Sequence, residues 1–121
     1  FHAFLLDQLS GLPGVTLRRM FGGAGLYRDG VMFGLVADTL YLKVDDRNRA
    51  DFTAAGMGPF VYEAKGKPMS MGYFQVPPEV LEDAERLVPW AEKSLAVALA
   101  ARAQAPVRKP AARATAKRRD A

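Results

Sequence analysis

The sequence predicts an α+β domain in which helices pack on an antiparallel sheet, followed by a basic tail. Apolar side chains recur at helical spacing near both ends of residues 1–101, apolar runs of strand length fill the middle, and glycine-containing turns separate those runs. The expected order is one helix, three strands, one helix, two strands and one helix. Because 121 residues suit one ordinary domain, we place the domain at residues 1–101 and the tail at 102–121.

The N-terminal half is expected to contain one helix and a meander of three strands. Residues 1–12 have apolar side chains at helical spacing, and Pro13 prevents the helix from continuing. Strands are expected over residues 15–27, 31–37 and 40–44, with tight turns between them. Short turns of this kind join antiparallel neighbours.

A second helix and a second pair of strands are expected next. The helix begins at Asp45 or Asp46, whose carboxylate caps it, and ends at Gly56. Strands are expected over residues 60–63 and 69–76, with glycine and proline between them as turn residues.

The last helix is expected to begin at Glu79, because apolar residues recur at the helical period from there to position 99. Pro89 lacks an amide hydrogen and is expected to kink this helix or divide it. Asp83 is then placed to cap the second part.

These elements direct nine large apolar side chains toward the interior. The residues expected to be largely buried are Phe21, Phe33, Leu35, Leu42, Phe52, Phe60, Phe74, Leu87 and Leu95.

Cysteine is absent, and the only histidine is His2. This composition excludes disulfides, thiolate zinc sites, iron–sulfur clusters and a cysteine nucleophile, and it leaves almost no donors for a triad or a multi-histidine metal site. We therefore expect no catalytic residue, no cofactor and no bound metal, and a protein that is not an enzyme. No run approaches the roughly 20 apolar residues of a membrane-spanning helix, so the expected location is the cytoplasm.

Acidic residues form two groups, Asp45-Asp46 and the cluster from Glu82 to Glu85. Both groups lie at expected helix starts, where the helix dipole favours negative charge. Capping is therefore preferred to metal binding or acid–base chemistry.

Three glycines, Gly22, Gly23 and Gly25, lie within four residues. They lack the last glycine and the following helix of a dinucleotide-binding fingerprint. The preferred interpretation is structural: at least one of them has a positive φ or lies at a β-bulge. The alternative is an enzyme or binding protein for a phosphorylated ligand or nucleic acid, with its site near these glycines. Four basic residues would line that site: Arg18, Arg19, Lys65 and Lys67.

Charge is distributed unevenly along the chain. Residues 1–101 carry a net charge of −2, whereas residues 102–121 carry +6. The second segment has no aromatic residue and cannot build a core, so a flexible tail is expected. This tail either only solubilises the protein or binds nucleic-acid phosphates without sequence preference. The candidate nucleic-acid-binding residues are Arg108, Lys109, Arg113, Lys117, Arg118 and Arg119.

Residues 18–36 (RRMFGGAGLYRDGVMFGLV) and 40–45 (LYLKVD) resemble the N-terminal domain of the TfoX (Sxy) competence-regulator family. The resemblance continues in the same order through residues 48–52, 59–63, 65–68 and 73–81. The residues that carry the family motif are Met20, Phe21, Gly22, Gly23, Gly25, Lys43, Lys65, Gly66, Lys67 and Pro68.

The resemblance implies a fold and a biological setting. The family fold is an α+β sandwich with the same order of elements as expected above. The named regulators are bacterial proteins that promote expression of DNA-uptake genes alongside a cyclic-AMP-responsive activator, and they carry a second, helical domain where this sequence has basic residues. The resemblance thus implies a small regulatory or interaction module whose partner is a transcription regulator or nucleic acid. A homodimer formed through a sheet edge is a further alternative, and no membrane partner is expected.

Overall fold

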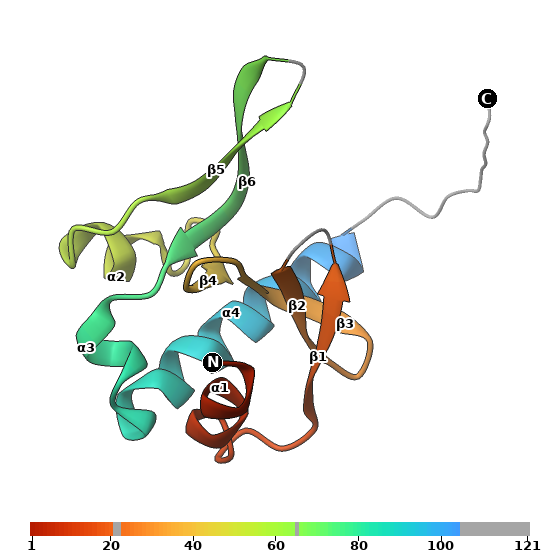
Figure 1. The fold of residues 1–121 in the computed structure, drawn as a ribbon, viewed down its shortest axis with the longest axis vertical. Helices are drawn as coiled ribbons and strands as arrows, with labels where there is room; N and C mark the ends of the chain where they lie inside the picture. The colour runs from red at the N-terminus through yellow and green to blue at the C-terminus, as the bar shows by residue number, and fades with distance from the viewer. Residues whose placement is uncertain (21–22, 65, 105–121) are drawn as a thin grey trace.

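The computed structural model describes residues 1–20, 23–64 and 66–104 (Figure 1). Among these residues, no helix has both the length and the hydropathy that crossing a bilayer requires. The elements, in chain order, are α1 (His2–Gln8), β1 (Val15–Met20), β2 (Gly23–Arg28), β3 (Val31–Val36), β4 (Leu40–Lys43), α2 (Arg49–Ala54), β5 (Pro59–Ala64), β6 (Lys67–Gln75), α3 (Pro78–Leu81) and α4 (Ala84–Gln104).

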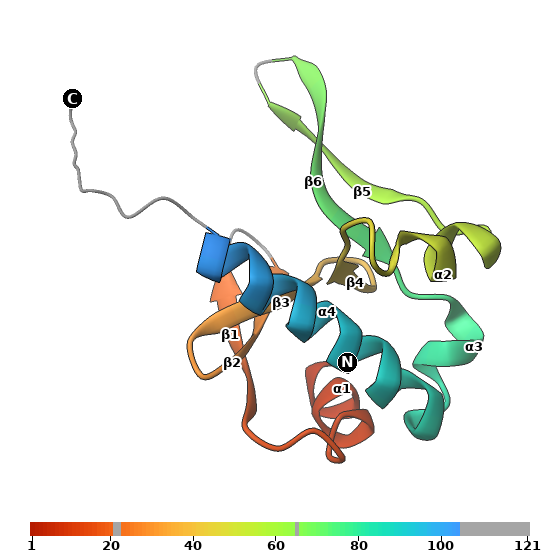
Figure 2. The same cartoon turned by 180° about the vertical axis from the view of Figure 1, so that it is seen from behind.

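The six strands form one antiparallel sheet in the order β1-β2-β3-β4-β6-β5, and the predicted α+β class is confirmed. The helix α4 crosses one side of the sheet, and α1 and α3 lie on the same side (Figures 1 and 2). The side chains of all four helices contribute to the apolar cluster on that side. The described helices therefore leave the opposite face of the sheet uncovered.

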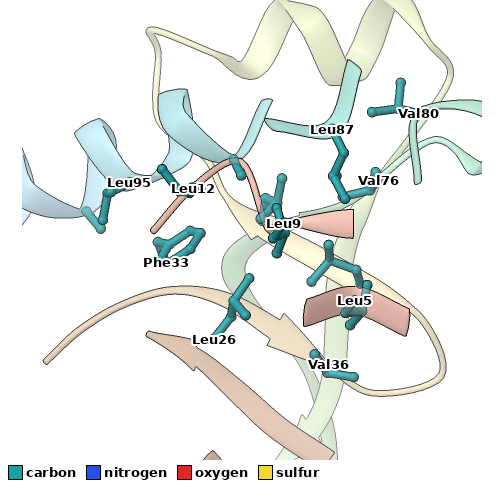
Figure 3. Packing of buried hydrophobic residues seen from close by; sticks show 14 of the residues in the cluster. Leu5, Leu9, Leu12, Leu26, Phe33, Val36, Val76, Val80, Leu87 and Leu95 are labelled. Atoms are coloured by element: carbon teal, nitrogen blue, oxygen red, sulfur yellow. The ribbon is translucent and has the colours of Figure 1, made fainter. Parts of the chain in front are cut away.

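The main core lies between this sheet and the helices (Figure 3). Six of the nine expected core residues are buried, namely Phe33, Leu35, Leu42, Phe52, Leu87 and Leu95. Phe60 and Phe74 are partly buried against apolar clusters, and Phe21 lies outside the described residues. Leu35 belongs to a second, smaller cluster on the other face of the sheet.

A bulge in β3 determines which face its side chains reach. Leu26 pairs with Gly34 while Tyr27 pairs with Met32, so Phe33 is an extra residue without a partner in β2. The extra residue shifts the alternation of the strand. Phe33 therefore lies in the main core, whereas Met32 and Leu35 lie on the helix-free face.

The prediction of one strand over residues 15–27 is wrong, because this segment contains two strands, β1 and β2. Met20 pairs directly with Gly23, so β1 and β2 are antiparallel neighbours and the chain reverses between these residues. The meander consequently has four strands rather than three. Glycine suits a turn as well as a bulge, and the sequence signal alone did not separate the two.

The second helix begins later than expected, at Arg49. The Asp45 carboxylate accepts a hydrogen bond from the Arg47 amide at 2.8 Å, which closes a turn before the helix rather than capping it. Gly56 has a φ of +77° and follows the helix as expected.

The C-terminal helical region is divided before Ala84 and not at Pro89. The Asp83 carboxylate accepts a hydrogen bond from the Glu85 amide at 3.1 Å, so its expected capping role is confirmed. Pro89 lies inside α4, where it leaves the Glu85 carbonyl without a helical partner. Both residues are exposed, so water can reach that carbonyl.

Candidate functional site

The helix-free face of the sheet carries a second group of packed side chains. Its buried centre consists of Leu35, Tyr41 and Tyr73, and Met20 and Met32 pack against it. We call this surface the tyrosine face and define it by Arg18, Met20, Tyr27, Met32, Leu35, Tyr41, Lys43, Phe60 and Tyr73.

Gly25 forms the floor of this face on β2. A Cβ at Gly25 would lie 2.7 Å from Cε1 of Tyr27, 3.1 Å from Cε of Met20 and 3.3 Å from Sδ of Met32. The missing side chain thus leaves the space in which the Tyr27 ring lies, and Arg18 pairs with Gly25 from the neighbouring strand. The glycine serves packing of the protein's own side chains, which argues against an open ligand cradle there.

The expectation of a positive φ or a bulge is wrong for Gly23 and Gly25. Both residues pair within β2, neither has a positive φ, and the bulge lies at Phe33 instead. Gly23 is required by a close approach of backbones, because a Cβ there would lie 2.2 Å from the Val36 carbonyl oxygen. Gly22 lies outside the described residues.

Two cations lie over tyrosine rings on this face. Cζ of the exposed Arg18 is 5.2 Å from the centroid of the Tyr27 ring, and Nζ of Lys43 is 5.1 Å from the centroid of the Tyr73 ring. Each contact is worth about 0.5–1 kcal/mol at an exposed position. In the described part of the chain, the salt bridges involve neither of these two cations.

The hydroxyls of Tyr41 and Tyr73 stay protonated at neutral pH because the pKa of each is raised. The Tyr41 hydroxyl donates a hydrogen bond to Oδ1 of Asp38 at 2.8 Å. Burial, followed by the hydrogen bond to Asp38 and its negative charge, raises the pKa of Tyr41 to about 12. Burial also raises the pKa of Tyr73, with a further contribution from Tyr27. Asp38 is thus bound to Tyr41, whereas the two charged residues that define the face, Arg18 and Lys43, are positive.

A buried polar link fixes the end of β4, which carries Lys43. The Asn48 amide donates to the Lys43 carbonyl at 3.0 Å and to the Ser94 hydroxyl at 3.3 Å. Its oxygen accepts from the Asp45 amide at 3.0 Å. Asn48 and Ser94 are both buried, so this link connects β4 to α4 with every side-chain polar group of Asn48 paired.

The family-motif residues divide into three groups. Met20, Gly23, Gly25 and Lys43 lie in β1, β2 and β4, next to or within the tyrosine face. Gly66 adopts a φ of +77° before β6, in which Lys67 and Pro68 lie. The motif residues Phe21, Gly22 and Lys65 lie outside the described residues.

The four basic residues of the alternative ligand site do not form one described cluster. Arg18 contacts Tyr27 on the helix-free face, whereas Arg19 is the next residue of the same strand and points to the other face. Three strands separate β1 from β6, which begins with Lys67. The distribution of Arg18 and Arg19 over two faces argues against one pocket.

Several carboxylates form ion pairs, and for Asp46 this differs from the expected capping role. Asp46 pairs with Arg49, and Asp51 pairs with Lys93 at 2.7 Å between α2 and α4. Within residues 1–20, 23–64 and 66–104, no three histidine, aspartate or glutamate side chains gather in a way that would hold a metal ion.

Basic residues outnumber acidic ones in the strands, whereas the helices carry both signs. The strands contain one acidic residue, Glu63, and five basic ones: Arg18, Arg19, Arg28, Lys43 and Lys67. The helices and the α3–α4 turn carry seven acidic residues, Asp7, Asp51, Glu79, Glu82, Asp83, Glu85 and Glu92, and four basic ones, Arg49, Arg86, Lys93 and Arg102. Both views place the C-terminal end of α4, which carries Arg102, at the end of the sheet where β1 ends (Figures 1 and 2).

The basic residues predicted to bind nucleic acid follow this end of α4 in the sequence. Arg108, Lys109, Arg113, Lys117, Arg118 and Arg119 all lie outside the described residues. The tyrosine face was missed by sequence reasoning, which assigned its aromatic and methionine residues to strands or core. The alternation of Leu17, Arg18, Arg19 and Met20 was a signal for two faces, but pairing across strands was needed to assemble them.

A family model described as the TfoX N-terminal domain matches residues 7–98. The match includes all six strands, α2 and α3, and most of α4. No curated protein matches the sequence.

Proposed function

The chain belongs to the TfoX N-terminal domain family, and from this premise we propose that it is a small, non-enzymatic regulatory module that binds nucleic acid. We further propose that it acts in the cytoplasm in transcriptional control of DNA uptake, as the resemblance to the family's regulators implies. The basic residues from Arg108 to Arg119 supply most of the affinity in this proposal.

The distribution of charge is the observation that carries the proposal. The strands contain five basic residues and one acidic residue, and the last turn of α4 adds Arg102 at the same end of the sheet as Arg18 and Arg19. Six more basic residues follow in the sequence. Arg18 and Lys43 on the helix-free face, Arg102 at the end of α4 and the basic residues that follow it in the sequence attract a polyanion.

The roles of the carboxylates support a non-enzymatic module. Asp45 and Asp83 accept backbone hydrogen bonds next to helices, while Asp46 and Asp51 form ion pairs. General acid–base chemistry needs carboxylates that converge on a substrate, whereas these are engaged in local structure.

Salt titration of duplex DNA binding tests the proposal. The full chain is compared with a chain lacking residues 105–121 and with a full-length variant in which the six basic residues are glutamine. With about six phosphates engaged, log K of the full chain falls against log salt with a slope near −5. Both altered chains are expected to lose most of the affinity and of the slope. Equal affinity in all three would contradict the assignment to these residues, and no binding by any would contradict the proposal.

A further inference from the structure

We propose that the tyrosine face binds single-stranded nucleic acid, with unpaired bases against its aromatic side chains and phosphates at Arg18 and Lys43. This inference rests on the proposed function for the chemistry of the partner. It adds a site within the folded domain and a preference for unpaired strands, neither of which the basic residues after α4 can provide.

The aromatic side chains provide the reason for single strands. Tyr27 and Phe60 are only partly buried, and Phe60 stacks edge-on against Tyr41 with ring centroids 4.9 Å apart. Met32 on β3 lies between the strands of Tyr27 and Phe60, and Met20 on β1 extends the apolar surface beyond Tyr27. In a duplex the base faces are stacked on one another, so only an unpaired strand can present them to protein rings.

The two cations provide the phosphate contacts. Arg18 lies on β1 and Lys43 on β4, three strand spacings apart, which is roughly 14 Å across the sheet. They can therefore meet different phosphates of one strand that crosses the face. Each cation sits over a tyrosine ring, so a base that stacks on the Arg18 guanidinium or on Tyr27 stays within reach of a charge.

Charge complementarity selects a polyanion over other occupants of this face. The described cations of the face are not used in salt bridges, and the Asp38 carboxylate accepts a hydrogen bond from the Tyr41 hydroxyl. The face also reaches the end of the sheet where α4 ends, and six basic residues follow α4 in the sequence. Those residues include no aromatic side chain and have no means of distinguishing unpaired bases.

The experiment measures binding of the full chain to a dye-labelled thymidine oligonucleotide and to a duplex of the same length, by fluorescence anisotropy at low salt. The face variant is Arg18→Gln with Lys43→Gln. Its matched control is Arg19→Gln with Arg86→Gln, which removes the same charge from exposed positions outside the tyrosine face. A second pair of variants, Tyr27→Leu and Tyr27→Phe, removes or keeps the ring.

The face variant and Tyr27→Leu are expected to weaken single-strand binding by about ten-fold. Duplex binding by the face variant is expected to change only as much as in the control, and Tyr27→Phe should bind like the parent. Equal losses in the face variant and the control would overturn the inference, even if Tyr27→Leu is unfolded. In the proposed function, duplex binding depends on residues 105–121. If the parent binds duplex and the face variant binds the single strand as well as its control does, this site is refuted and the proposed function still stands. If the parent chain binds neither the single strand nor the duplex, both this site and the proposed function are refuted.

Discussion

Asn48 shows how one buried polar side chain determines local structure in this domain. Its three hydrogen bonds reach the Asp45 amide, the Lys43 carbonyl and the Ser94 hydroxyl. Asn48→Ala leaves the buried Ser94 hydroxyl and the partly buried Asp45 amide and Lys43 carbonyl without this partner and is expected to cost about 2–3 kcal/mol of unfolding free energy. Urea denaturation measures the loss.

Ser94→Ala is the matched comparison for Asn48→Ala. It removes one of the three hydrogen bonds and leaves the other two in place, so a loss of about 1 kcal/mol is expected. Equal losses for the two variants would show that the link to α4, rather than the β4–α2 turn, carries the whole effect.

Tyr41 is expected to make stability depend on alkaline pH. Its pKa is 10.0 in the unfolded chain and about 12 in the fold, because burial and Asp38 disfavour the phenolate. The stabilising contribution is therefore complete below pH 10 and is lost as the pH rises toward and through 12. Unfolding measured at a series of alkaline pH values should show this loss, and Tyr41→Phe should reduce it. An unchanged profile in Tyr41→Phe would assign the dependence to another group.

At the scale of elements, the two glycines of β2 should respond differently to substitution. Gly25→Ala meets the Tyr27 ring at 2.7 Å, whereas Gly23→Ala meets the Val36 backbone at 2.2 Å. A side chain can move and a paired strand cannot, so Gly23→Ala is expected to cost more stability. Thermal melts of both variants, each also combined with Tyr27→Leu, measure the coupling.

Tyr27→Leu is expected to relieve Gly25→Ala and to leave the cost of Gly23→Ala unchanged. The relief should amount to about 1 kcal/mol or more, since overpacking of this kind typically costs about 1–3 kcal/mol. Additive costs in both combinations would contradict the assignment of Gly25 to the space beneath the ring.

The sequence patterns located elements that depend on the periodicity of one segment. They failed for features that depend on how two strands pair. Helical spacing located α1 and the C-terminal helices, and turn residues located the β5–β6 hairpin. The reversal between β1 and β2 was missed, because the local signal of glycine is shared by a turn and a bulge. The bulge at Phe33 depends on the register between β2 and β3, which no single-strand pattern contains.

The candidate site was predictable only in part for the same physical reason. The basic residues after α4 are contiguous in sequence and were identified from composition alone. The tyrosine face is assembled from β1, β2, β3, β4, β5 and β6, so its members are dispersed from Arg18 to Tyr73. The start of α2 was also predicted too early, because the Asp45 carboxylate accepts a hydrogen bond from the Arg47 amide in the turn before the helix instead of capping it.

At the scale of the whole molecule, the domain has two chemically different sides. One side presents helices with charged residues of both signs, and the other presents an uncovered sheet face with tyrosines and two cations. The sheet edges are β1, with adjacent arginines, and β5, which begins at Pro59. Charge and proline are features that hinder pairing of edges. The homodimer through an edge stays a prediction, and the open face is the surface we assign to a partner.

The methionine methyl groups allow one direct measurement of this two-sided account. Met20 and Met32 pack on the tyrosine face, whereas Met57 packs against the main core on the helix side. In the full chain with isotope-labelled methionine methyls, titration with a thymidine oligonucleotide is followed by NMR. The account predicts that the Met20 and Met32 signals shift together as the strand binds while the Met57 signal stays in place. A shift of Met57 at saturation, with Met20 and Met32 unmoved, would contradict it.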